Sequence, residues 1–519
     1  MSGNAVAILW GIQHDKAGTA EANTALPTSK HQQFSTLRAF AREMEPKSTS
    51  NARCLNGHGT SVNLVELRSL LNDAIINYER NRPKSLSIHK NALEVLPGGN
   101  TRSVLYTDPF PICMDLGKGN RLVDVDGHEY LDLIGEMTAG LCGHSHPIIQ
   151  ETIISTVLKK GLNLGATTAI EFEFAQEICR RFSSIELLRF CNSGTEANLY
   201  AISVARQATG LSKIIVFSGG YHGGVLTFLH GVAANNVDKE NWIIGKYNDV
   251  EGTRKLICEN KGKAAAVLVE GMQGAGGCIP GNPEFLHTIQ TTAKENGLIF
   301  ILDEVMTSRL GQGGLQSRIL SPVDHTALRP DITTLGKYIA GGMTIGAFGG
   351  RTDLLSVYDP RPSSVSGNSE KSLKPISHSG TFNNNTLAMS VGLVTMSTVY
   401  TAHICSDLNA MGDKFRQNLI EIGRGTRMTV SGVGAVCNIH FVSQTLSGDI
   451  RCMEDLEDMQ TETDLILKDV FWFHAIERGF WIARRGMLAL IMGTTELELG
   501  GFLEFVKEFM QNFQSVLKL

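Results

Sequence analysis

The sequence predicts an α/β protein: a mostly parallel sheet flanked by helices, combined with a smaller α+β domain. Between about residues 145 and 350, short runs rich in isoleucine and valine alternate with amphipathic stretches. Such runs suit strands that are buried on both faces of a parallel sheet, and their alternation with helices is typical of a doubly wound domain. After about residue 390, helical stretches mix with runs such as AVCNIHFV, which predicts the second domain.

The expected segments are a flexible extension over residues 1–60, the N-terminal part of the small domain over 61–144, the large domain over 145–389 and the rest of the small domain over 390–519. The extension is polar and lacks periodicity. In the second segment, VNLVELRSLLNDAIINYERN has apolar residues at helical spacing. NRLVDVDGHEYLDLIG alternates around Asp126 and Gly127, which predicts a hairpin.

The composition is that of an ordinary globular protein. Of the 519 residues, 42% are hydrophobic and 19% charged, and the formal net charge is −5. This charge argues against a nucleic-acid partner, and no apolar run approaches the length of a membrane span. The ten cysteines form no CxxC pair and no Cys/His cluster at zinc spacing, so we expect no metal site and reduced thiols. The first residues make a poor signal peptide, and we expect a cytoplasmic protein.

Four predicted strand ends carry polar side chains, and ligands of such sheets bind beyond the carboxyl ends of the strands. The first, LLRFCNSGTEAN, runs through Ser193, Gly194 and Thr195 into a helix. The free N–H groups and the dipole of such a helix start favour a phosphate, although the same residue types also serve as a plain helix cap. The second, FSGGYHGG, places Tyr221 and His222 among glycines. There the tyrosine ring either stacks on a flat ligand or belongs to an ordinary loop.

The third and fourth strand ends carry an acid and a lysine. Asp303 directly follows the apolar run LIFIL. A carboxylate at this place is costly without a partner, which is either an ion pair, a helix cap or a cationic ligand atom. Lys337 is the single charged residue of TLGKYIAGGMTIGAFGG. Its head group either reaches water along apolar surface or, if desolvated, becomes a neutral and nucleophilic amine.

These four features together describe one ligand, pyridoxal 5′-phosphate (PLP). The ligand needs a phosphate site, a stacking ring, an acid for its protonated ring nitrogen and a lysine that forms a Schiff base. No single motif is specific, but four in order on successive strand–helix units are hard to assemble by chance. We therefore predict a PLP enzyme with Lys337, Asp303 and Tyr221 as catalytic residues.

From about residue 62 to 519, the chain resembles the class III (ω-type) PLP-dependent aminotransferases of fold type I. The resemblance is carried by GHSHP, RFCNSGTEAN, GGYHGG, ILDEVMTSR, TLGKYIAGG and HSGTFNNN. It implies that Lys337 forms the Schiff base and that Asp303 contacts the pyridine nitrogen. It also implies that Val305 packs under the cofactor ring and Tyr221 over it.

The resemblance implies further cofactor contacts. In this family the active site lies at a dimer interface, and a Gly-Thr pair of the partner subunit reaches the phosphate. Here that pair is Gly380 and Thr381, so we expect a homodimer with shared active sites. The other cofactor-binding residues implied are Ser193, Gly194 and Thr195 at the phosphate, and His222 and Glu270 near the cofactor.

Within the family, VLPGGNTRSVLYTDPFP looks most like the transaminases of β-amino acids, the β-phenylalanine type. There the arginine of GGNTRS binds the substrate carboxylate, which implies Arg102 here, and a planar guanidinium suits bidentate carboxylate binding. In IARRGMLAL, Arg485 matches a second arginine that receives the other carboxylate of 2-oxoglutarate, with Arg484 as the neighbouring alternative. The alternative interpretation for both arginines is that each forms an ion pair at the protein surface and binds no substrate.

Three functions are compatible with these motifs. The first is a transaminase that moves an amino group from a β-amino acid, or a related amino acid, to a 2-oxo acid such as 2-oxoglutarate. The second is a glutamate-1-semialdehyde-type 2,1-aminomutase, a class that shares LPGG and DEVMT with this chain but typically differs after the LPGG glycines. The third is a non-catalytic scaffold, against which the intact lysine, acid and phosphate motif argue. The sequence favours the transaminase and leaves the substrate side chain open.

Overall fold

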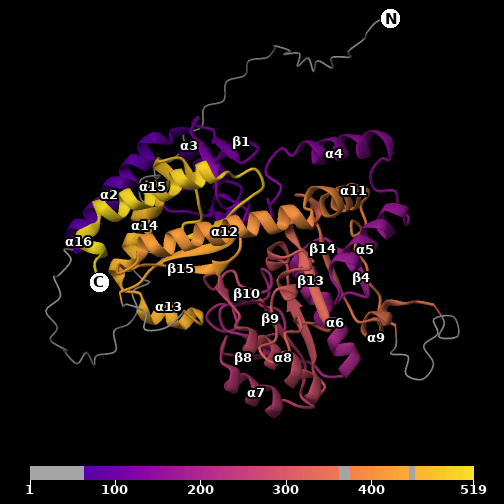
Figure 1. Cartoon of the computed structure of the whole chain (residues 1–519). Helices are drawn as coiled ribbons and strands as arrows, with labels where there is room; N and C mark the ends of the chain where they lie inside the picture. The colour runs from indigo at the N-terminus through magenta and orange to yellow at the C-terminus, as the bar shows by residue number, and fades with distance from the viewer. Residues whose placement is uncertain (1–63, 362–374, 444–449) are drawn as a thin grey trace, which may run out of the picture. The chain divides into compact units, whose positions relative to one another are not determined.

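A computed structural model of the chain describes residues 64–361, 375–443 and 450–519 (Figure 1). The extension predicted over residues 1–60 lies outside the described residues. The described chain belongs to one compact unit. The boundaries expected at residues 144/145 and 389/390 therefore stay predictions.

The large sheet has seven strands in the order β4-β14-β13-β12-β9-β5-β8. Strands β8, β5, β9, β12 and β13 run parallel, and β14 runs antiparallel to both of its neighbours. Their bounds are β4 Leu187–Cys191, β5 Lys213–Phe217, β8 Trp242–Gly245, β9 Ala264–Glu270, β12 Ile299–Asp303, β13 Ile332–Gly336 and β14 Gly346–Gly350. Every residue of β9, β12, β13 and β14 is buried, which confirms the mostly parallel, doubly covered sheet.

Helices cover both faces of this sheet, as the alternation of side chains along β5 shows. Ile214 and Val216 belong to the apolar cluster that includes α6, whereas Ile215 and Phe217 belong to the cluster that includes α8. Successive residues of a strand point to opposite faces, so the two clusters lie on opposite sides of the sheet. The helices of this part are α4 Pro147–Lys159, α5 Ala169–Arg181, α6 Gly194–Thr209, α7 Val250–Glu259, α8 Pro283–Asn296, α9 Thr352–Leu355 and α11 Thr386–Val394.

A second sheet joins the two ends of the described chain. Its order is β1-β2-β3-β17, with β1 Met114–Lys118, β2 Arg121–Asp124, β3 Glu129–Asp132 and β17 Phe480–Trp481. β2 and β3 form the antiparallel hairpin predicted around Gly127, which has a positive φ of 97°. β17 pairs in parallel with β3, so an N-terminal and a C-terminal segment build one sheet. This pairing supports a small domain made from both segments.

The N-terminal helices α2 and α3 and the C-terminal helices α14 and α15 lie near this second sheet, where the indigo and yellow ends of the chain meet (Figure 1). The predicted N-terminal helix is α2, and it packs against α14. A third sheet has the order β15-β16-β18, and β16 is the predicted strand AVCNIHFV. The bounds are α2 Leu64–Asn81, α3 Pro83–Ala92, α12 Ala402–Gly423, α13 Met453–Met459, α14 Glu462–Glu477, α15 Glu496–Asn512, α16 Gln514–Leu517, β15 Met428–Val433, β16 Val436–Phe441 and β18 Met487–Ala489.

Among the described helices, none is by itself long and apolar enough to cross a membrane. Thr386–Val399 and Ala402–Gly423 pass that test together, but they are bent by 73° at the break between them. Most of α11, the first part of this pair, is buried within the fold.

Candidate active site

The predicted phosphate site lies where β4 leads into α6. Ser193 is the N-cap residue, and its side-chain oxygen accepts a hydrogen bond from the Glu196 amide at 3.2 Å. The first amides of a helix have no acceptor within the helix, so they remain for a ligand. Gly194 packs closely on Val305, because a Cβ added to the glycine would lie 2.6 Å from a methyl group of the valine. Ser193 therefore caps the helix. The backbone amides of the first turn remain accessible to a ligand.

The GGYHGG loop folds onto this helix start. A Cβ on Gly223 would overlap the Thr195 side chain, and the glycine has a φ of +131°. Both the available space and the backbone conformation therefore require glycine at this position. Tyr221, in the short strand β6 (Gly220–Tyr221), donates its amide to Glu270 Oε1 at 3.0 Å. Its side chain is 46% exposed. The ring is thus free to cover a flat ligand.

Asp303 ends β12 and is buried among hydrogen-bond donors. Its Oδ2 lies 2.8 Å from His222 Nδ1 and accepts a hydrogen bond from Asn198 Nδ2 at 2.8 Å, while its Oδ1 accepts from the Val305 amide at 2.9 Å. Asn198 is itself fixed, because Thr334 Oγ1 donates to its Oδ1 at 2.7 Å. These partners compensate the burial of the carboxylate.

The structure places His222 beside Asp303 rather than on an open face, so this histidine orients the acid. Asn198 and Thr334 were not singled out from the sequence, although both lie in quoted motifs, GTEAN and DITTLGK. The sequence feature that could have identified these two residues is a polar side chain within a segment that is expected to be buried. Such side chains are usually hydrogen-bonded to one another.

Lys337 follows β13 with a left-handed φ of 55°. Its Nζ donates a hydrogen bond to Thr138 Oγ1 at 2.9 Å. Part of the side chain is accessible, but burial of the amine lowers its pKa to about 8. The carboxylates of Asp303 and Glu270 oppose this shift, and the nearby positive charge of Arg485 adds to it. The side chain therefore has the partly desolvated amine that a Schiff base needs.

Glu270 lies at the end of β9 and holds backbone. Its Oε1 accepts from the Tyr221 amide, and its Oε2 accepts from the Gly274 amide at 3.1 Å. Burial raises the pKa of this carboxyl group to about 7. The contacts indicate that Glu270 positions the tyrosine loop.

Gly380 and Thr381 lie in an exposed turn. The turn is attached to the phosphate site, because Asn192 donates to Asn383 Oδ1 at 2.8 Å and Tyr200 donates to the Ser379 carbonyl at 2.9 Å. That Gly380 and Thr381 contact the phosphate bound by another subunit stays a prediction.

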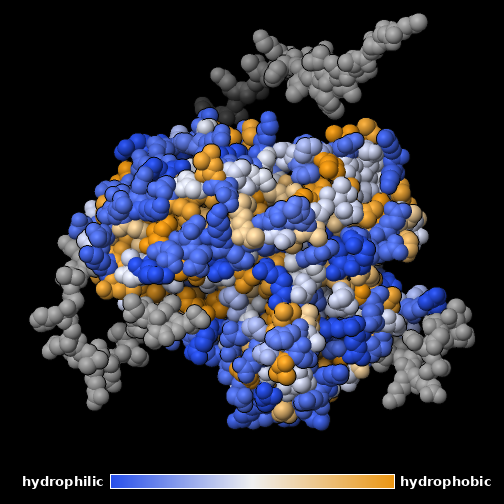
Figure 2. Space-filling model, in the orientation of Figure 1, coloured by the Kyte–Doolittle hydropathy of each residue, from blue (hydrophilic) through white to orange (hydrophobic). Residues whose placement is uncertain are grey.

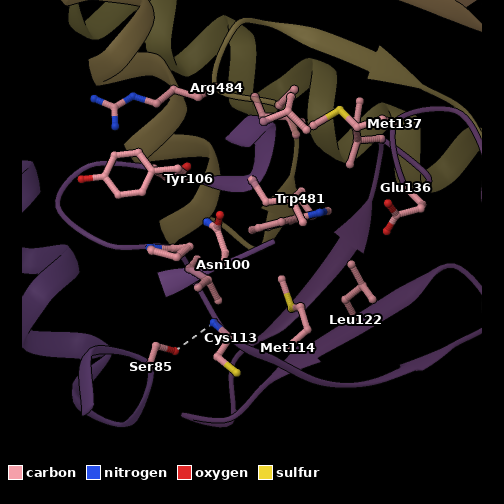
Figure 3. A pocket seen from close by; sticks show the side chains of 18 of the residues that line it. Ser85, Asn100, Tyr106, Cys113, Met114, Leu122, Glu136, Met137, Trp481 and Arg484 are labelled. Carbon is pink, nitrogen blue, oxygen red and sulfur yellow. Dashed lines mark hydrogen bonds between the residues drawn. The ribbon is translucent and has the colours of Figure 1, made fainter. Parts of the chain in front are cut away.

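A cavity of about 750 Å³ reaches the turn that contacts the lysine, because Met137 lines it and the next residue, Thr138, accepts the hydrogen bond from Lys337. It lies between α3 with the loop that follows it, on one side, and the β1-β2-β3-β17 sheet on the other (Figure 3). Met114, Leu122, Met137 and Trp481 give it an apolar wall, and Tyr106 lies across from them. This cavity is suited to the apolar side chain of a small molecule.

Two neighbouring arginines line the cavity, but they differ in their partners. Arg484 donates to Asp469 at 2.8 Å and to the Asp108 carbonyl at 2.6 Å, and it lies over the Trp472 ring. Arg485 has a buried Nε without a hydrogen-bond partner and forms no ion pair among the described residues. The geometry therefore favours Arg485 over Arg484 as the binder of a ligand carboxylate.

Arg102 forms an ion pair with Glu136, whose side chain lines the cavity. Both side chains are about half exposed. The arginine that the resemblance assigns to the substrate thus already holds a carboxylate, which belongs to the protein itself.

The side chains around Lys337 fit PLP. The free amides of α6 suit a phosphate, Gly194 and Gly223 allow Val305 and Thr195 to pack closely at this site, and Asp303 is held ready for a cationic ring nitrogen. Within the residues that the structure describes, no group of three or more His, Cys, Asp or Glu could hold a metal ion.

Comparisons with known proteins also identify aminotransferases as relatives of this chain. The family model for class III aminotransferases matches residues 105–489. An uncharacterized aminotransferase of Schizosaccharomyces pombe is 44% identical over 438 residues, which cover 84% of this chain and 94% of that protein. A β-phenylalanine transaminase of Variovorax paradoxus is 39% identical over 442 residues, which cover 85% and 95%.

A solved structure adds the fold. The crystal structure of a β-phenylalanine aminotransferase from Variovorax paradoxus superposes with a TM-score of 0.80 at 38% identity and covers 87% of this chain and 99% of that one. The family model spans well over half of the sequence, and the relatives span more than two thirds of it. The chain therefore belongs to the class III aminotransferases, which are PLP-dependent enzymes of fold type I.

Proposed function

We propose that this aminotransferase takes the amino group of a β-amino acid and passes it to a 2-oxo acid such as 2-oxoglutarate. The observation that carries the proposal is that Arg485, which lines the cavity, has no acidic partner among the described residues, while Arg102 pairs with Glu136, a residue that also lines the cavity. The similarity to a β-phenylalanine transaminase supports the class of donor. The apolar cavity supports a donor with a bulky side chain.

In this proposal the residues around the cofactor divide the work of binding. The amides of Gly194 and Thr195 hold the phosphate, and Ser193 fixes the helix start. Tyr221 and Val305 cover the two faces of the ring. Bound PLP withdraws electrons from the carbon that bears the amino group and so makes its proton acidic.

The other residues govern the proton. Asp303 holds a proton on the ring nitrogen, because its carboxylate is fixed by His222 and Asn198. Lys337 Nζ takes the proton from the carbon that bears the donor's amino group, and a pKa of about 8 suits a base near neutral pH.

The two arginines are assigned to different substrates. The donor carries one carboxylate and 2-oxoglutarate carries two, so one arginine cannot serve both. We assign Arg102 to the donor and Arg485 to the second carboxylate of the acceptor. A buried charge without its partner costs about 2–3 kcal/mol, which corresponds to a loss of roughly 30- to 150-fold in affinity.

Single-turnover kinetics of each half-reaction, followed by the absorption of the cofactor, test this assignment. Arg485→Ala should damage the reaction with 2-oxoglutarate and spare that with pyruvate, whereas Arg102→Ala should raise KM for the donor. Arg451→Ala is the matched control, because the exposed Arg451 forms an ion pair with Asp455 and does not line the cavity. Equal losses for both acceptors in Arg485→Ala would refute the division between the arginines.

A panel of donors and acceptors tests the class of reaction. The expected result is faster turnover of β- than of α-amino donors and dependence on an external 2-oxo acid. A preference for α-amino donors would refute the β-amino acid assignment. Conversion of a single substrate without any acceptor would show an aminomutase instead.

The proposal includes a homodimer with shared active sites. Hydrophobic residues gather over α4 and α5, at the upper right in Figure 2, and among them Leu158 is 78% and Phe172 65% exposed. A patch of this kind is typical of an interface. Mixing Lys337→Ala with Thr381→Arg tests the sharing, because the heterodimer would regain one intact site. No recovery of activity after verified subunit exchange would contradict it.

A further inference from the structure

The turn after β3 has an unusual backbone. Gly135, Glu136, Met137 and Thr138 all have positive φ, at 50°, 50°, 51° and 78°. Positive φ is uncommon for residues other than glycine, and for a β-branched residue such as Thr138 it is a true outlier. Strained backbone of this kind persists only where its surroundings impose it, and it gathers at functional sites.

Two side chains impose this turn. Asp132 Oδ1 accepts hydrogen bonds from the amides of Ile134 and Gly135, both at 2.9 Å. Arg309 is fully buried and donates to the carbonyls of Thr138 and Leu490. It forms no ion pair within the described part of the chain. A buried guanidinium is costly, and here one of its hydrogen bonds holds the Thr138 carbonyl of the turn.

The turn separates the cavity from the lysine. Glu136 and Met137 line the cavity (Figure 3), whereas Thr138 is fully buried and its Oγ1 accepts the hydrogen bond from Lys337 Nζ at 2.9 Å. A lysine amine ends a long and flexible side chain, and its position decides how well it can exchange a proton with a substrate carbon. The hydroxyl group fixes that position.

We propose that Thr138 is a positioning residue, whose hydroxyl group holds the Lys337 amine in line for proton transfer while the amine is not joined to PLP. The inference rests on the role given to Lys337 in the proposed function. Nζ takes one proton from the carbon that bears the donor's amino group and later releases one. The proton would pass to the cofactor carbon that receives the amino group, so the free Lys337 amine carries the same number of protons before and after this transfer, and Thr138 itself neither gains nor loses a proton.

Three variants test this role. Thr138→Val keeps the shape of the side chain and removes the hydroxyl group, whereas Thr138→Ser keeps the hydroxyl group. Thr292→Val is the matched control, because Thr292 is a buried threonine of α8 whose Oγ1 has no hydrogen-bond partner among the described residues. Should Thr138→Val not fold, Thr138→Gly replaces it, since glycine accepts a positive φ.

Two measurements are made on each variant. The first is the single-turnover rate of the donor half-reaction. The second needs no substrate: the apoenzyme is labelled with acetic anhydride at a series of pH values, and mass spectrometry of the Lys337 peptide gives the pKa of that amine. Because the second measurement uses no donor, a wrong donor class in the proposed function leaves its result intact. A Lys337→Ala variant that still binds PLP covalently would instead show that the lysine is wrongly assigned.

We expect Thr138→Val to slow the donor half-reaction about ten- to hundredfold, the usual effect of a hydrogen bond to a charged group. It should also lower the pKa of Lys337, because the hydroxyl oxygen favours the charged amine. Thr138→Ser and Thr292→Val should stay within about threefold of the wild type in rate, well below the loss of such a bond. Wild-type behaviour of Thr138→Val in both measurements, or an equal loss in Thr138→Ser, would overturn the proposal.

Discussion

The amine of Lys337 should titrate near pH 8 in the apoenzyme, well below an ordinary lysine. Burial is the largest cause, because it disfavours the charged amine. The carboxylates of Asp303 and Glu270 act in the opposite direction, and without them the pKa would fall further. Capture of PLP requires the neutral amine, so its rate reports this titration.

The magnitude follows from the two pKa values. With a pKa of about 8, roughly 10% of the amine is neutral at pH 7, against roughly 0.03% for an ordinary lysine with a pKa of 10.5, a difference of about 300-fold. The capture rate should therefore rise about tenfold per pH unit below pH 8 and level off above it. An ordinary lysine would give a rate that still rises to about pH 10.

Stopped-flow absorption of apoenzyme mixed with PLP measures this rate from pH 6 to 10. A free lysine derivative under the same conditions corrects for the titration of PLP itself. Asp303→Asn should move the break in the profile to lower pH, because it removes the largest effect that raises the pKa. Asp353→Asn, at an exposed surface acid, should leave the break in place. A rate that rises steadily through pH 9 in the wild type would refute the reasoning.

Three further predictions concern single side chains. Asp303→Asn should bind PLP but lose most of its turnover, since an amide cannot keep the ring nitrogen protonated; normal steady-state rates would exclude that role. Gly194→Ala should weaken PLP binding, measured by titration of the apoenzyme, because the new Cβ lies 2.6 Å from a Val305 methyl group. Glu136→Gln should lower KM for the amino donor a few-fold by releasing Arg102, and a higher KM would mean that the glutamate instead positions the arginine.

The strands, and the polar residues that follow three of them, could be predicted because each depends only on the residues next to it in the sequence. Asp303 and Lys337 follow apolar runs that must be buried, and Ser193 precedes a helix, so position in the chain already fixes position at the sheet edge. The partners of these residues are not local. Asn198 lies one turn inside α6 and Thr334 within β13, and only the packing of this helix on the sheet brings them to one carboxylate.

The choice between Arg484 and Arg485 shows the same limit. The two arginines are adjacent in an irregular segment between β17 and β18, where no periodicity tells which side chain points inward. Their contacts differ because Asp469, 15 residues earlier on α14, binds the guanidinium of Arg484. A contact of this kind follows from the placement of a helix, which sequence spacing does not give.

The turn from Gly135 to Thr138 could not be predicted from the sequence, because its backbone conformation opposes the φ preference of most of its residues. Only one of its four residues is glycine, and intrinsic propensity favours negative φ at the other three. The conformation is imposed from outside, by Asp132 and by the buried Arg309. Its consequence is chemical, because one tight turn directs Glu136 to the arginine that is to bind the donor and Thr138 to the amine that is to take its proton. If the proposed roles of Arg102 and Lys337 hold, donor binding and proton transfer are coupled through the backbone of this turn, and we expect a substitution that relaxes the turn to change both.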